Sequence, residues 1–267
     1  MSGIVEEYLS LKADTDADLL AMQVGDFYEF FDEDAREVAA ELDLKVSEKS
    51  SHGSSYPMAG VPVAELTPYL KNLVERGYRV AVADQHEVDG GHERAITRVV
   101  TPGTLLETTD ASAQYLATVV RGDGETFGLA FVDVTTGRFH VTQVGSLEDA
   151  ITEVYRFDPA EVLPGPALRS DGTFDAFRNR TDATITHHDE ESFAPGAATH
   201  RLREQFGEEA LHSLGIEPGS PAVQAAGAAL AYVTETGLGV AGSVTRLQPY
   251  RADDHVELDA TTQRKRE

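Results

Sequence analysis

Two spacings of hydrophobic residues alternate along the first hundred residues of the chain. Apolar side chains at helical spacing predict helices over residues 4–12 and 32–42, and a third from Leu66 until Gly77. Short apolar runs bounded by glycine, proline or polar residues predict strands between these helices. The strands are expected at residues 19–24, 27–31, 44–47, 78–83 and 96–100. Strands that alternate with helices indicate a small α/β domain with a mixed sheet.

Three connections in this part have recognisable turn chemistry. Gly25-Asp26 separates two apolar runs and predicts a turn, although this order is a weaker hairpin signal than Asp-Gly. Residues 50–56 are polar and contain serine and glycine, so they predict a loop that ends at Pro57. Residues 58–62 are expected to continue that loop into the following helix.

The second part of the chain begins with three consecutive strand patterns. They lie at residues 114–121, 127–134 and 138–144, and glycine-containing turns join them. Shorter elements follow: helices at 147–157 and 170–179, strands near 160–163 and 183–187, and an alanine-rich helix at 219–236. Three meandering strands followed by alternating elements predict a ribonuclease-H-like α/β domain.

A polar, threonine-rich stretch at residues 101–113 marks the expected boundary between the two domains. We therefore predict one domain over residues 1–110 and a second over residues 111–250. Residues 251–267 begin a helical pattern that stops almost as it starts, which predicts the truncated start of a third domain.

The net charge of the chain limits the partners that such a protein is expected to bind. The 46 acidic residues outnumber the 22 basic ones, for a net charge of -24, and the excess is found in both halves of the chain. This surface disfavours non-specific binding to DNA or to anionic membranes. Only five of the basic residues are lysines, and the composition is typical of a halophilic protein.

The remaining composition favours a cytoplasmic protein. Cysteine is absent, which excludes disulfides and thiolate metal sites and favours a reducing compartment. The first residues lack the pattern of a secretory signal. No apolar stretch reaches the roughly 18 residues of a membrane span, so no membrane partner is expected.

One short segment combines two kinds of chemistry. In Gly25-Asp26-Phe27-Tyr28-Glu29-Phe30-Phe31, an aromatic ring and a carboxylate stand two residues apart and project from the same face of an extended strand. A ring beside a carboxylate is able to stack on a nucleic-acid base and hydrogen-bond its edge. Four aromatic residues in five also fit an ordinary core strand, but a carboxylate among them is costly to bury without a partner.

Several motifs of this chain, in this order, resemble the MutS family of DNA mismatch-repair proteins. The resemblance covers essentially the whole chain. The motifs are residues 25–31, Pro57-Met58-Ala59-Gly60-Val61-Pro62, Val80-Ala81-Val82-Ala83-Asp84-Gln85, Arg98-Val99-Val100-Thr101-Pro102-Gly103-Thr104, Val132-Asp133-Val134-Thr135-Thr136-Gly137-Arg138-Phe139 and Leu258-Asp259-Ala260-Thr261-Thr262-Gln263-Arg264.

This resemblance implies a mismatch-recognition domain followed by a connector domain and the start of the lever and core region. By motif position, Phe27 would insert into the minor groove and stack on one unpaired base, and Glu29 would hydrogen-bond that base. Wedging unstacks and kinks the duplex, which costs less at a mispair. If Glu29 bonds a purine acceptor nitrogen, its carboxyl must be protonated, which predicts a raised pKa.

The resemblance also implies further DNA contacts. Met58, Ala59, Gly60 and Pro62 match a family loop that lies against the minor groove. Lys49 is a candidate phosphate contact, although the chain has Ser47-Glu48-Lys49 where the family usually has Thr-Lys-Arg or Thr-x-Arg, which weakens the expected anchoring.

The implied partners are mismatched double-stranded DNA, MutL through the connector domain, and a second copy in a full-length dimer. No catalytic residue, metal or cofactor is expected in this fragment. No G-x-x-x-x-G-K-[ST] motif occurs, so the chain is not expected to hydrolyse ATP through a P-loop. ATP and Mg²⁺ would belong to an ATPase domain further along a full-length family member.

Two other functions remain as alternatives. A MutS-like paralogue would bind branched DNA or only protein partners. A metal-dependent nuclease would use Asp133, at the place where ribonuclease-H-like enzymes carry a carboxylate, although a turn-forming aspartate is the simpler interpretation.

The glycine-rich run at residues 237–242 follows a helix rather than a strand, so it is not a dinucleotide site. His187-His188 has no further metal ligand at a helpful spacing, so a solvated loop is the simpler interpretation.

Overall fold

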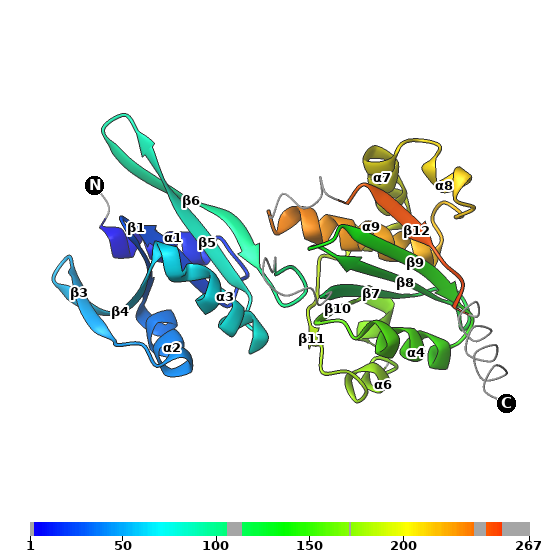
Figure 1. Ribbon diagram of the computed structural model, residues 1–267, viewed down its shortest axis with the longest axis horizontal. Coiled ribbons are helices and arrows are strands. Elements are labelled where there is room, and N and C mark those ends of the chain that lie inside the picture. Colours follow the sequence, from blue (N-terminus) through cyan, green and yellow to red (C-terminus); the bar gives the residue numbers. More distant parts are fainter. Residues whose placement is uncertain (1–2, 106–113, 171, 238–243, 253–267) are drawn as a thin grey trace, which may run out of the picture. The chain divides into compact units, whose positions relative to one another are not determined.

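The computed structural model describes residues 3–105, 114–170, 172–237 and 244–252 (Figure 1). These residues form two compact α/β units, and each is described by itself. Within those ranges, no helix is both long enough and apolar enough to cross a membrane.

The first unit is built on a six-stranded mixed sheet with the order β3-β4-β2-β1-β5-β6. Strands β1 and β5 run parallel, and every other neighbouring pair is antiparallel. Its elements are α1 Ile4–Ala13, β1 Leu19–Val24, β2 Phe27–Phe31, α2 Asp32–Leu42, β3 Ser47–Ser51, β4 Ser54–Pro62, the 3-10 helix η1 Val63–Glu65, α3 Leu66–Glu75, β5 Val80–Val88 and β6 Gly91–Val100.

Each face of this sheet has its own hydrophobic core. On one face, α2 and α3 pack against alternate residues of β1, β2, β4 and β5, and Tyr28 and Phe30 belong to this core. On the other face, α1 covers Leu20, Met22 and Phe31. Strand β2 therefore sends side chains into both cores, as the two-residue period of a strand requires.

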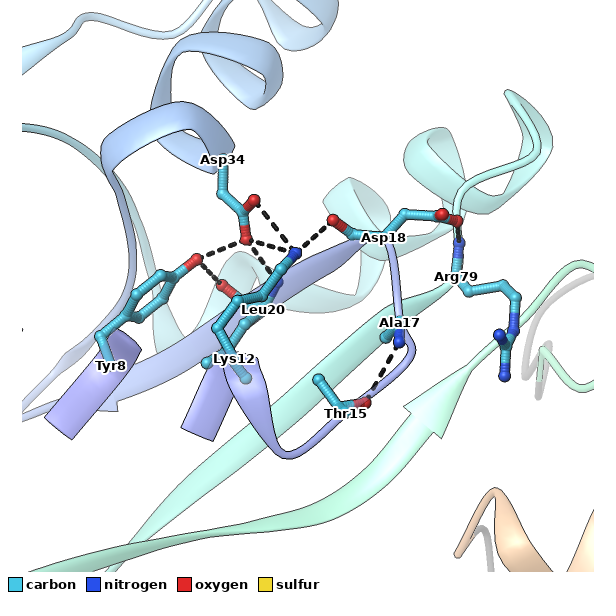
Figure 2. A network of polar contacts seen from close by, with 8 residues as sticks. All are labelled: Tyr8, Lys12, Thr15, Ala17, Asp18, Leu20, Asp34 and Arg79. Carbon is cyan, nitrogen blue, oxygen red and sulfur yellow. Dashed lines mark hydrogen bonds and ion pairs between the residues drawn. The ribbon is translucent and has the colours of Figure 1, made fainter. Parts of the chain in front are cut away.

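A buried carboxylate ties α1 to the rest of the first unit (Figure 2). Asp34, in the first turn of α2, accepts hydrogen bonds from the Tyr8 hydroxyl at 2.6 Å and from the Leu20 backbone N–H at 2.9 Å. The Lys12 ammonium donates to the same carboxylate at 3.0 Å and also to the Asp18 carbonyl. Two segments, α1 and β1, thus converge on one charged side chain of a third, α2.

The structure confirms the three predicted helices and strands β1 and β2 of the first unit, but β3 was misplaced, β4 was missed, and β5 and β6 are longer than predicted. The strand expected at 44–47 lies at Ser47–Ser51, and the expected loop at 50–56 is the β3–β4 hairpin. Residues 58–62 belong to β4 and are not a loop. Strands β5 and β6 also extend well beyond 78–83 and 96–100. The β3–β4 turn region and the extensions of β5 and β6 are polar and largely exposed, so they lack the short apolar runs on which the prediction depended.

The second unit has a six-stranded sheet with the order β11-β10-β7-β8-β9-β12. Strands β7, β8 and β9 form an antiparallel meander, and β10 and β11 continue the sheet parallel to β7. This is the predicted ribonuclease-H-like arrangement, extended by β12 alongside β9. The elements are β7 Tyr115–Arg121, β8 Phe127–Asp133, β9 Arg138–Val144, α4 Leu147–Phe157, β10 Glu161–Pro164, α5 Pro166–Arg169, α6 Asp175–Arg178, β11 Thr184–Ile185, η2 Glu191–Phe193, α7 Pro195–Phe206, α8 Ala210–Ser213, α9 Pro221–Glu235 and β12 Arg246–Pro249.

Helices cover both faces of this sheet (Figure 1). Helices α4, α5 and α6 pack with Phe127, Leu129 and Phe131 in one core. On the opposite face, the start of α9 approaches β8 so closely that a Cβ on Gly128 would lie 2.0 Å from the Pro221 carbonyl carbon. Glycine at position 128 therefore sets the distance between α9 and the sheet.

In the second unit the sequence predicted strands β7 to β11, but it missed β12 and several helices. The helix expected at 170–179 is replaced by the short α5 and α6, and the prediction contained no counterpart of α7, α8 or β12. The expected truncated domain at 251–267 lies almost entirely outside the described residues.

We predict that Asp34→Ala lowers the free energy of unfolding by about 3 kcal/mol, because it leaves Lys12 and the Leu20 N–H without their buried acceptor. The matched control is Glu33→Ala, on the same helical turn but exposed, where a loss of about 0.5 kcal/mol is expected. Urea denaturation of both variants measures the difference. Equal losses would contradict the role given to Asp34.

Candidate nucleic-acid interface

Strand β2 holds one exposed aromatic ring among buried ones. Tyr28, Phe30 and Phe31 are at most 6% exposed, whereas Phe27 is 47% exposed. Phe27 is the first residue of the strand and follows the Gly25-Asp26 turn. Gly25 has φ +61°, at the position where a type II′ turn places glycine. The turn thus presents the Phe27 ring at the end of the sheet, outside both cores.

Phe27 and Glu29 share one face of β2, as their spacing predicts. The register of β2 and β4 places Pro62 beside Phe27 and Gly60 beside Glu29. A Cβ on Gly60 would lie 3.6 Å from Glu29 Cγ and 3.9 Å from Phe27 Cδ1, so the bare glycine lies between the two side chains. Their shared surface is therefore open above Gly60.

The other predicted residues of β4 are distributed over both faces. Met58 lies opposite Phe31 on the face of Phe27 and packs at the edge of the α1 core. Ala59 is 1% exposed and belongs to the opposite core, so its side chain is not part of the Phe27 surface. The structure thus brings Phe27, Glu29, Gly60 and Pro62 together and separates Ala59 from them.

Glu29 is a poorly solvated carboxylate. Its side chain is 12% exposed, its Oε2 atom is buried without a hydrogen bond, and its nearest cation is Lys49 Nζ at 3.7 Å. Burial raises the pKa of the Glu29 carboxyl above its usual range, and the positive charges of Lys49 and Arg94 oppose this shift without cancelling it. A protonated carboxyl has an O–H that is able to donate to a base nitrogen.

Lys49 is therefore engaged with Glu29 in the free chain, and its neighbour Glu48 is engaged elsewhere. The Ser55 hydroxyl donates to Glu48 at 2.8 Å across the β3–β4 hairpin. Because adjacent residues of a strand face opposite sides, Glu48 points away from the face that carries Lys49.

Polar groups that the sequence reading missed lie on the other side of the same strand. The Tyr28 hydroxyl donates to Asp84 at 2.5 Å, and the Thr97 hydroxyl donates to the same carboxylate at 2.6 Å. Burial and this hydrogen bond raise the pKa of Tyr28 to about 12. Tyr28 is thus a fixed, neutral partner of β5 and β6. No sequence signal pairs residues so far apart.

The alternative sites gain no support in the described residues. The Asp133 carboxylate is fully buried and accepts hydrogen bonds from the Thr135 N–H at 3.0 Å and from the Thr136 hydroxyl at 2.6 Å. It stabilises the β8–β9 turn. Among the residues that the structure places, no group of three potential metal ligands occurs, at His187-His188 or elsewhere. The glycine-rich run after α9 lies largely outside the described residues.

The fold and this surface define a two-unit α/β protein with an exposed ring beside a buried carboxylate, and comparisons with known proteins identify its family. The family models described as MutS domain I and MutS domain II match residues 2–109 and 114–247. The chain therefore belongs to the MutS family.

Relatives from several organisms agree with this membership. The chain is 64% identical, over 98% of its length, to DNA mismatch repair protein MutS 1 of Haloarcula marismortui, and 66% identical over 98% to the protein of the same name from Halobacterium salinarum. It is 38% identical over 94% of its length to DNA mismatch repair protein MutS of Thermus aquaticus. The chain covers 29%, 30% and 28% of these three relatives, about three tenths of their length.

We predict that Glu29 titrates above the ordinary glutamate value of 4.5 in the folded chain. Since the folded pKa exceeds the unfolded one, the contribution of Glu29 to stability is greatest below 4.5 and falls as the pH rises through the folded pKa. NMR titration of the side-chain carboxyl carbon measures this value directly.

Removing the nearby positive charge should raise the pKa of Glu29 further. Lys49→Gln tests this, and Lys45→Gln, an exposed lysine of the same segment, is the matched control that should leave the titration unchanged. A Glu29 that titrates at its ordinary value, or that responds equally to both substitutions, would contradict this description of the site.

Proposed function

We propose that the first unit recognises mispaired or unpaired bases in duplex DNA, with Phe27 as the stacking residue and Glu29 as the hydrogen-bonding residue. The observation that carries the proposal is the exposure of the Phe27 ring on a strand whose other aromatic side chains are buried. An apolar ring held at the end of a rigid sheet suits insertion into the minor groove.

Stacking suits a sensor of many different mispairs. Base–aromatic stacking contributes about 1–3 kcal/mol per base and is largely indifferent to base identity. A mismatch lowers the cost of unstacking, so the same ring enters a mispaired step more readily than a paired one. Selectivity thus arises from the deformability of the DNA.

Glu29 supplies a second, more specific contact in this proposal. Its raised pKa favours a protonated carboxyl once DNA excludes the remaining water, and that carboxyl donates to an acceptor nitrogen of the stacked base. Gly60 and Pro62 border the same surface and offer backbone and apolar contact to the groove, beside the partly buried Met58. Lys49 leaves Glu29 for a phosphate.

The wider functional setting is also a proposal, supported by the family resemblance and by the share of each relative that the chain covers. We propose that the chain acts within a longer cytoplasmic protein that dimerises and carries its ATPase, with ATP and Mg²⁺, in another domain. The second unit would then connect the DNA-reading unit to that machinery and offer a surface to MutL.

We predict that Phe27→Ala, introduced into the longer protein, lowers the ratio of mismatched to matched duplex affinity by about 5- to 150-fold, the equivalent of the stacking energy. Fluorescence anisotropy titrations with the two duplexes measure this ratio. Val88→Ala is the matched control, because Val88 is 45% exposed in the same unit but lies in the β5–β6 hairpin. A ratio unaffected by Phe27→Ala would overturn the proposed function.

Salt separates this contact from phosphate binding. For phosphate contacts, the logarithm of the binding constant falls linearly with the logarithm of the salt concentration, whereas stacking releases no counterions. We therefore predict that the selectivity loss caused by Phe27→Ala persists between about 0.2 M and about 2 M KCl, while the affinity for matched DNA falls steeply. A loss that disappears at high salt would show that the ring acts only alongside ionic contacts.

A further inference from the structure

The Gly25-Asp26 turn that presents Phe27 is held from both sides by residues distant in sequence. On one side, the Gly25 N–H donates to Gln85 Oε1 on β5 at 3.2 Å. On the other, the Val63 N–H donates to the Asp26 carbonyl at 2.9 Å. A two-residue turn at a sheet end would otherwise be free to move with little cost.

Arg94 on β6 lies at the centre of the contacts on the Gln85 side. Its Nε donates to the Gln23 carbonyl at 2.6 Å, one Nη to Glu7 of α1 at 2.7 Å, and the other Nη to Gln85 Oε1 at 2.8 Å. One guanidinium thus joins β1, α1 and β5. Its side chain is 9% exposed, so these contacts are largely shielded from water.

Gln23 closes the network around the turn. The Gln85 backbone N–H donates to Gln23 Oε1 at 3.1 Å, and Gln23 Nε2 donates to the Gly25 carbonyl at 3.2 Å. Both backbone polar groups of Gly25 are therefore bonded to side chains of this network. The network ends two residues before Phe27.

The chemistry of this network requires an arginine. A planar guanidinium reaches three acceptors in fixed directions at once, whereas a lysine ammonium acts as a mobile point charge. A role as a phosphate contact fits poorly, since the guanidinium is 9% exposed and already bonded to Glu7. The geometry instead suits the fixing of a short segment of backbone.

We infer that Arg94 and Gln85 are positioning residues that clamp the Gly25-Asp26 turn and thereby set where the Phe27 ring enters DNA. This inference rests on the proposed function of Phe27. Its physical basis is preorganisation: a ring that is already in place loses less conformational freedom on binding, and a small displacement is costly for an interaction that depends on ring overlap.

The test compares Arg94→Lys and Gln85→Ala with the wild type in the longer protein. Arg94→Lys keeps the positive charge near Glu29 but loses the three-way fork, and Gln85→Ala removes the acceptor of the Gly25 N–H. The matched control is Arg76→Lys, at the C-cap of α3, whose guanidinium bonds Asn72 and Glu41 instead. Chemical denaturation verifies that each variant is folded.

Both clamp variants are expected to lower the ratio of mismatched to matched duplex affinity by about 2- to 100-fold. Affinity for matched duplex should change by no more than about twofold, because a positioning residue touches no phosphate. In the Phe27→Ala background the clamp variants should cause no further loss of selectivity. Amide exchange at Gly25 should accelerate in both variants and remain unchanged in Arg76→Lys.

The contrary outcomes are distinct. Equal loss of affinity for both duplexes would make Arg94 a phosphate contact and overturn the clamp. Additive effects with Phe27→Ala, or unchanged Gly25 exchange, would overturn it as well. If Arg94→Lys unfolds, Gln85→Ala alone tests the clamp, through the ratio of duplex affinities and the amide exchange of Gly25. If Phe27→Ala itself leaves selectivity intact, the proposed function fails first, and the clamp fails with it.

Discussion

The two-residue period of strand β2 is the constraint on which the first unit depends. One five-residue strand supplies Tyr28 and Phe30 to the core under α2 and α3, and Phe31 to the core under α1. The same alternation leaves Phe27 and Glu29 on the α1 side, at the end of the sheet that reaches the turn. A shift of one residue in the register with β4 would bury Phe27 and expose Tyr28, so the folding of both cores and the presentation of the ring are specified together.

Desolvation then gives Glu29 its chemistry. Two cations act on this carboxylate, yet burial outweighs them and its pKa stays raised. The Asp84 carboxylate, on the face of the sheet that carries Tyr28, differs from Glu29 because both of its oxygens accept short hydrogen bonds, from Tyr28 and Thr97. A carboxylate whose oxygens are all hydrogen-bonded stabilises the fold. A carboxylate with a buried, unbonded oxygen is held in a less favourable state that a ligand is able to relieve.

Features that depend on neighbouring residues were predictable from the sequence, whereas contacts between residues distant in sequence were not. Short apolar runs bounded by turn residues identified β2 and β8 to within a residue, because the signal lies within each strand. The polar hairpin β3–β4 carries no such signal, and its first strand was misplaced. The contacts of Arg94 with Gln23 and Glu7 span 71 and 87 residues, so no local pattern was able to reveal them. The shared face of Phe27 and Glu29 was therefore predictable from their spacing, whereas the distant contacts around the Gly25-Asp26 turn were not.

The scarcity of positive charge explains why positioning matters in this chain. Of its five lysines, Lys12 and Lys49 are paired with Asp34 and Glu29, and Arg94 is bonded to Glu7. With a net charge of -24, basic side chains near the candidate surface are thus already used within the fold. In the proposed function, attraction to phosphate would then contribute little to holding DNA in register, and less still in concentrated salt. Under that constraint, the proposed selectivity would depend on short-range stacking, and stacking would depend on a ring whose location is fixed before DNA binds.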